Sequence, residues 1–150
     1  MKPLNLPVDP MEDSQRLMGE LLPTAKLLLE RYGEFFPMGA EIGFDGEAQH
    51  VPAPEGIDQT NTLAVAELLR QAFAIRAEQG ELRASAIIQD LMALELDAER
   101  GADAVSIEIE HFTGYNVTMI VRYKRLDGHI TFEAPFVNEG VYRIFPRRQG

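Results

Sequence analysis

The sequence predicts a single α+β domain: an antiparallel sheet of five to seven strands, with two amphipathic helices packed on one face and the other face partly open. Three observations lead to this prediction. Apolar residues recur at helical spacing in two segments, they alternate with polar residues in the C-terminal third, and Asp-Gly pairs stand twice between strand-like runs. The domain is expected to span residues 1–150, with residues 1–8 as an extended leader and residues 146–150 as a flexible tail.

The first predicted helix begins next to Asp9, because its carboxylate can accept hydrogen bonds from the free amides of a first turn. Pro10 suits the first helical position. An apolar stripe at three- to four-residue spacing then continues to Tyr32, and Gly33 is a suitable stop. Pro23 lies inside this stripe and predicts either a kink or a break that opens a second short helix.

A hairpin is predicted next, with Asp45-Gly46 as the turn between the strand-like runs 35–44 and 47–51. The aromatic residues Phe35, Phe36 and Phe44 are expected to pack with Met38 in the core.

The second predicted helix covers residues 60–79, where apolar residues keep helical spacing, and Gly80 would end it. The following stretch, residues 82–97, is ambiguous. Its Ala, Leu and Glu content favours a helix, whereas its apolar residues alternate at period two except at Asp90. Periodicity alone leaves both alternatives open.

The C-terminal third predicts β-structure throughout. Alternation of apolar and polar residues predicts strands at 105–110 and 115–125, separated by the turn Thr113-Gly114. Asp127-Gly128 predicts a hairpin into a strand at 129–134, and a last short strand is expected at 141–145.

Composition excludes several classes of function. The chain has no cysteine, which rules out disulfides, thiolate metal sites and cysteine nucleophiles. The net charge of −10 argues against nucleic acids and anionic membranes as partners. No apolar run approaches the roughly 18–20 residues of a membrane span, and the N-terminus lacks the apolar region of a secretory signal. We therefore expect a cytoplasmic protein.

The charge is unevenly distributed along the chain. Residues 1–121 carry 21 acidic and 8 basic side chains, a net charge of −13, whereas residues 122–150 carry 3 acidic and 6 basic ones, a net charge of +3. An acidic body speeds encounter with a basic partner, although it also serves solubility alone. The leading hypothesis is a non-catalytic module that binds another, basic protein. A structural homo-oligomer formed through an edge strand is an alternative.

The segment Glu108–His111 is the nearest approach to a chemical site. Glu108 and Glu110 are predicted on one face of a strand and His111 on the other. The two carboxylates could bind a metal with His50 or His129, or act as an acid–base pair, which makes a metal-dependent or hydrolytic enzyme the second alternative. Alternate acidic residues are also typical of a solvated strand face, so we assign no catalytic, cofactor or metal residue.

Other catalytic motifs are missing. The serines at 14, 85 and 106 lack a G-x-S-x-G elbow, and the glycines are too scattered to form a phosphate-binding loop. Whether the protein is an enzyme stays open, and the sequence favours that it is not.

Two stretches resemble known patterns. Residues 30–37, continuing to Asp45-Gly46-Glu47, resemble an "x-G-x-F-x-P-F … D-G-x" hairpin. Residues 103–111, with Gly114-Tyr115 and residues 121–123, resemble "D-A-I-x-I-x-L-E-H-x-x-G … P-Y", except that Arg122 stands where that pattern has proline. Together they are similar to small uncharacterised bacterial α+β proteins, some of them immunity proteins of toxin systems. The resemblance implies a strand for residues 84–96 and an inhibitor of a basic toxin as the form of the binding hypothesis.

Overall fold

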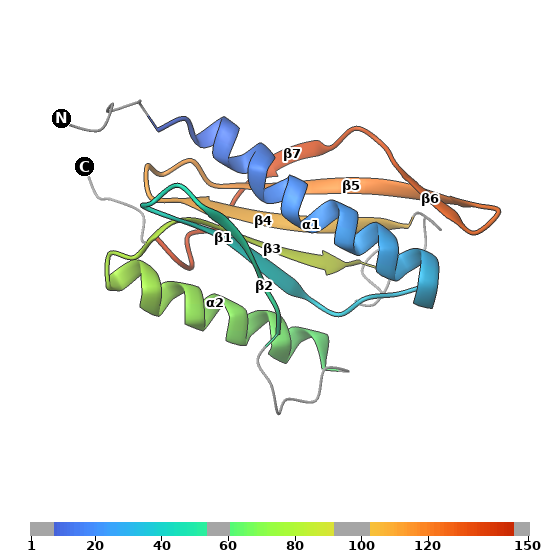
Figure 1. Ribbon diagram of the computed structural model, residues 1–150, viewed down its shortest axis with the longest axis horizontal. Coiled ribbons are helices and arrows are strands. Elements are labelled where there is room, and N and C mark those ends of the chain that lie inside the picture. The colour runs from blue at the N-terminus through green and yellow to red at the C-terminus, as the bar shows by residue number, and fades with distance from the viewer. Residues whose placement is uncertain (1–7, 54–60, 92–102, 146–150) are drawn as a thin grey trace.

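The computed structural model describes residues 8–53, 61–91 and 103–145. All but Val8 of the predicted leader, and the whole predicted tail, lie outside them. The described chain forms two helices and one antiparallel sheet of seven strands, which confirms the α+β prediction (Figure 1). The elements are α1 (Pro10–Tyr32), β1 (Met38–Gly43), β2 (Ala48–Val51), α2 (Thr62–Glu78), β3 (Leu82–Asp90), β4 (Ala104–His111), β5 (Val117–Leu126), β6 (His129–Phe132) and β7 (Phe136–Glu139).

The strand order is β2-β1-β3-β4-β5-β6, and β7 also pairs with β5. The first half of β5 pairs with β7 and the second half with β6, so these two short strands follow one another beside β5. Within the described ranges, β2 pairs only with β1 and forms the opposite edge of the sheet.

Most predicted boundaries are confirmed. The Asp9 carboxylate accepts a hydrogen bond from the Met11 amide, and Gly33 ends α1 in the left-handed conformation. The helix runs through the exposed Pro23 without a break. The Asp127-Gly128 turn has positive φ at both residues (52° and 79°), as a tight two-residue hairpin turn requires.

The ambiguous stretch at 82–97 begins as a strand. β3 occupies Leu82–Asp90 and is hydrogen-bonded between β1 and β4, so the alternation at period two outweighs the helical composition. The remainder of the predicted strand, from residue 92, lies outside the described residues. A central strand gains ladder hydrogen bonds on both sides, which overrides local helix propensity.

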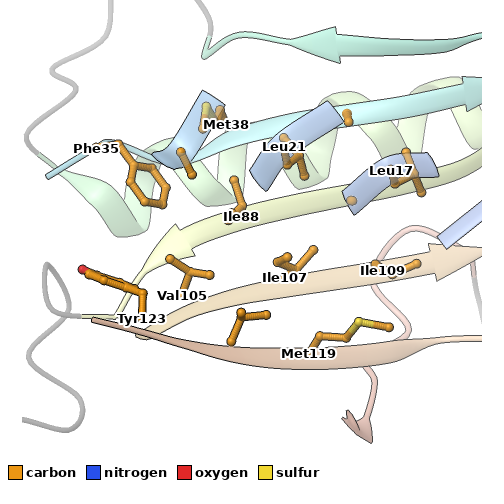
Figure 2. Close-up of a cluster of buried hydrophobic side chains, with 14 of the residues drawn as sticks. Leu17, Leu21, Phe35, Met38, Ile88, Val105, Ile107, Ile109, Met119 and Tyr123 are labelled. Atoms are coloured by element: carbon orange, nitrogen blue, oxygen red, sulfur yellow. The ribbon is translucent and has the colours of Figure 1, made fainter. Parts of the chain in front are cut away.

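The two helices were expected to share one face of the sheet, but they cover opposite faces. Ile88 of β3 packs with α1 in the larger core, whereas its neighbour Ile87 packs with α2 in a second, smaller core. In Figure 2, cut sections of α1 lie in front of the strands and α2 lies behind them. Successive residues of a strand point to opposite faces, so a strand that is apolar on both faces needs a cover on each.

The last strand was predicted in the wrong place. It is β7 at Phe136–Glu139, and residues 141–145 form no strand; they bend so that Ile144 packs with α2. Gly140 separates the two segments, and any side chain there would collide with the backbone of Asn116 and Val117. The dipeptide Asn138-Glu139 resembles a turn locally but pairs with β5 in the structure.

Core packing also corrects the prediction for one aromatic residue, Phe44. Phe35 and Met38 are buried in the α1 core, as Figure 2 shows, whereas Phe44 is exposed and stacks edge-on against Phe112.

Candidate functional site

The acidic strand β4 has the predicted orientation of its side chains. Glu108 and Glu110 point to the face that α2 covers, since Arg70 of α2 donates two hydrogen bonds to Glu108, at 3.2 and 2.7 Å. His111 points to the α1 face, where its Nε2 lies 2.9 Å from the Asp13 carboxylate of α1.

The metal hypothesis finds no support in the positions of the histidines. His50 lies on β2 with its Nε2 3.4 Å from the Met38 sulfur, and His129 lies on β6, 3.9 Å from Glu30. Neither joins Glu108 and Glu110. Within the described ranges, no three histidine, aspartate or glutamate side chains are grouped so that they could hold a metal ion.

Glu110 holds the C-terminal segment to the sheet. The buried Glu110 carboxylate accepts hydrogen bonds from the amides of Ile144 at 2.9 Å and Phe145 at 3.3 Å. Burial raises the pKa of Glu110, and these amides lower it only in part. Together with the Arg70–Glu108 ion pair, this contact fastens α2 and residues 144–145 to one face of the sheet, which is a structural role.

The opposite face carries a buried charged cluster that sequence reasoning missed. Asp13, in the first turn of α1, is only 3% exposed and accepts hydrogen bonds from Arg83 of β3 at 2.9 and 2.8 Å. His111 of β4 lies against the same carboxylate. Burial raises the pKa of Asp13, but the hydrogen bonds from Arg83 and His111 outweigh it and leave the pKa below its ordinary value. The carboxylate is therefore ionised and anchors α1 to two strands.

The hydrogen-bond roles of the two His111 ring nitrogens follow from their neighbours. The Thr113 amide donates to Nδ1 at 3.2 Å, so this nitrogen is the acceptor, and Nε2–H donates to Asp13. The Thr113 hydroxyl, 2.8 Å from Nδ1, completes a hydroxyl–imidazole–carboxylate order like that of serine hydrolases. However, the His111 ring is fully buried, and the Thr113 amide already occupies its Nδ1 lone pair. The contact holds the turn after β4 and does not prepare a nucleophile.

The surface between α1 and β2 carries two separate hollows, and we call this stretch of surface the α1–β2 seam. On the helix side it follows Glu20, Thr24, Leu28 and Tyr32, which are spaced by four residues and so share one face of α1. On the other side lies β2, the edge strand. Two hollows occupy the seam, one at each end.

The hollow near the start of β2 is polar and has a volume of about 450 Å³. It is lined by Arg16, Gly19, Glu20, Gly46, Glu47 and Ala48. The Arg16 guanidinium is already engaged, because it donates to the Gly46 carbonyl at 2.6 Å and lies 3.8 Å from Asp13. Glu20 and Glu47 form no ion pair within the described part of the chain, so this end of the seam is acidic.

The hollow near the end of β2 is mainly apolar and has a volume of about 570 Å³. Its lining comes from the end of α1, the segment leading into β1 and the end of β2: Thr24, Leu28, Tyr32, Glu34, Phe35, Phe36, Pro37, Met38, His50, Pro52 and Ala53. Tyr32 at its rim is 70% exposed. An apolar hollow with an exposed aromatic residue at the rim is typical of a binding surface.

The ion pairs explain why the surface of residues 1–121 stays acidic. Four of their basic residues, Arg16, Arg70, Arg76 and Arg83, form ion pairs with carboxylates of the same region. Each of these arginines is therefore offset by a carboxylate, and Arg70 and Arg83 are themselves largely buried and add little positive charge to the surface.

None of the described helices is long and apolar enough to cross a membrane. Comparisons with protein-family models, with curated proteins and with solved structures found no match to this chain.

Proposed function

We propose that this chain is a non-catalytic, cytoplasmic module that binds another protein through the α1–β2 seam. One observation carries the proposal: an open hollow of about 570 Å³, lined mainly by apolar side chains, lies directly beside an edge strand. Edge strands present unpaired amides and carbonyls to a partner, and adjacent apolar hollows accept its side chains.

The charge distribution supports a basic partner. Residues 1–121 have a net charge of −13, and Glu20 and Glu47 extend this negative charge into the seam. Opposite charge on a partner raises the rate of encounter and selects against acidic competitors. Inhibition of a basic toxin, as in immunity proteins, is the specific form of this function that we propose.

The test compares two variants that place the same charge on equally exposed residues. Tyr32 at the seam and Leu126 in the β5–β6 hairpin are each 70% exposed, so arginine at either position should leave the fold intact. Each variant and the wild type are used to capture proteins from the native host, at low and at high salt. The proposal predicts a partner that is retained by wild type and Leu126→Arg, lost with Tyr32→Arg, and weakened by salt.

Capture that is equal for both variants would show that binding occurs elsewhere, and the seam would have no role. Light scattering on the same samples addresses self-association. If the only partner of the seam is a second copy of the chain, the mass of wild type will double and that of Tyr32→Arg will not.

A further inference from the structure

The outer edge of β2 carries backbone groups that pair with no other strand of the described chain. The Gly43 amide donates to the Glu47 carbonyl at 3.4 Å, and Glu41 pairs with Gln49 two residues further along each strand. Hydrogen-bonded and non-bonded pairs alternate in an antiparallel ladder. Consequently, Gln49 directs its amide and carbonyl toward β1, whereas Ala48 and His50 direct theirs outward.

The side chains of a strand added to this edge would alternate between the two faces. Ala48 packs against the α1 core and His50 contacts Met38 of that core, so both point toward α1. Residues directly opposite each other on neighbouring strands share a face. Residues of the added strand opposite Ala48, His50 and Pro52 would therefore face the seam.

The two ends of the seam select different side chains. The end near Ala48 offers the carboxylates of Glu20 and Glu47, which form no ion pair with any described residue and suit a lysine or arginine. The end near Pro52 offers Leu28, Phe36 and other apolar groups, which suit a bulky apolar side chain.

The distance between the two ends of the seam determines how many residues separate the two side chains of the partner that bind there. Leu28 follows Glu20 by eight helical residues, about 12 Å at roughly 1.5 Å per residue. Four residues of a strand span about 13 Å. We infer that the seam binds an extended segment of a partner protein, paired antiparallel to β2, with a bulky apolar residue followed four positions later by lysine or arginine. A strand antiparallel to β2 meets Pro52 before Ala48, so the apolar residue comes first in the partner's sequence. The inference rests on the proposed function and specifies the chemistry of the partner.

The test is a selection from a random nonapeptide library displayed on phage, carried out with the full chain at low salt. Enriched peptides should share the apolar-x-x-x-basic pattern. The best of them is then synthesised with a fluorophore, and its affinity is measured by anisotropy. A version with the basic residue moved by one position should bind about four- to 25-fold more weakly, because that side chain then points to the other face and loses both carboxylates.

Three further measurements locate the peptide. Methylation of a peptide amide that faces β2 should abolish binding, whereas methylation of the next amide, which faces away, should not. Glu20→Gln and Glu47→Gln should each weaken binding about two- to fivefold, as for an exposed ion pair. Glu78→Gln on α2, which removes the same charge outside the seam, should have no effect.

The outcomes separate the inference from the proposed function. Peptides that lose binding with Tyr32→Arg but lack the pattern would overturn the inference and leave the seam as a binding site. Peptides that bind wild type and Tyr32→Arg equally well would count against both the inference and the proposed function. A library with no enriched peptide would overturn the inference, and the capture experiment would then decide on the proposed function alone.

Discussion

Replacing Asp13 with asparagine should destabilise the fold severely. The aspartate accepts three hydrogen bonds, two from Arg83 and one from His111, and the Arg83 and His111 side chains are only 14% and 0% exposed. Asparagine offers one acceptor oxygen and places an amide group against the remaining donors. Removing one partner of a buried ion pair costs about 3–5 kcal/mol, because the other charge stays buried without compensation.

The loss can be measured by thermal and urea unfolding. For about 150 residues, each kcal/mol lowers Tm by roughly 2–4 °C, so Asp13→Asn should lower it by about 6–20 °C. Asp127→Asn is the matched control, since Asp127 is exposed and asparagine tolerates its positive φ of 52°. The control should change stability by less than about 0.5 kcal/mol.

The pH dependence gives an independent check on the same residue. The pKa of Asp13 is lower in the folded chain than its ordinary value of 3.8, so its contribution is complete above that pH and is lost as the pH falls through the folded pKa. The stability difference between wild type and Asp13→Asn should therefore shrink below about pH 4. The reasoning would be refuted if Asp13→Asn cost less than about 1 kcal/mol, or if its effect simply added to that of Arg83→Met.

Two further predictions concern the glycines Gly39 and Gly19 and the buried carboxylate of Glu110. Gly39→Ala should destabilise the protein by about 1–3 kcal/mol, because a Cβ there would lie 2.8 Å from the Phe73 ring. A Cβ at Gly19 on α1 would meet no atom within 4 Å, so Gly19→Ala should stabilise the protein by about 0.5–1 kcal/mol through the higher helix propensity of alanine. Equal effects in urea unfolding would contradict this packing. Burial raises the pKa of Glu110 above 4.5. Between pH 4.5 and the raised pKa, the native state therefore binds more protons than the unfolded state, so the contribution of Glu110 to the free energy of unfolding falls as the pH rises. The stability of wild type relative to Glu110→Gln should accordingly decrease with increasing pH, and a constant difference would show that the carboxylate is not perturbed.

Local signals in the sequence predicted most element boundaries. Asp9 and Gly33 bound α1 because a cap depends only on a residue and the adjacent turn. Asp127-Gly128 gave the hairpin correctly for the same reason, since positive φ is a property of the two residues themselves. The prediction failed at the last strand, which was expected at 141–145 but forms at Phe136–Glu139, where the chain pairs with β5.

The candidate sites were less predictable. The orientation of Glu108 and Glu110 follows from strand alternation and was predicted, but their partners, Arg70 and the amide of Ile144, come from distant segments. Asp13 and His111 are 98 positions apart in the chain, and nothing local relates them. The one available signal was the position of Asp13 four residues before Leu17, which places an acidic side chain in line with the buried face of α1 and predicts a buried partner without identifying it.

The α+β class, the helix ends, the tight turns and the acidic character could all be predicted from the sequence, because each depends on neighbouring residues or on composition. The face of the sheet that each helix covers could not be predicted, since a period of two or 3.6 residues indicates that one side of an element is buried but not which element buries it. The α1–β2 seam could not be predicted from the sequence either. Its two hollows exist because α1 crosses the sheet beside an edge strand, and that placement follows from the packing of the whole chain.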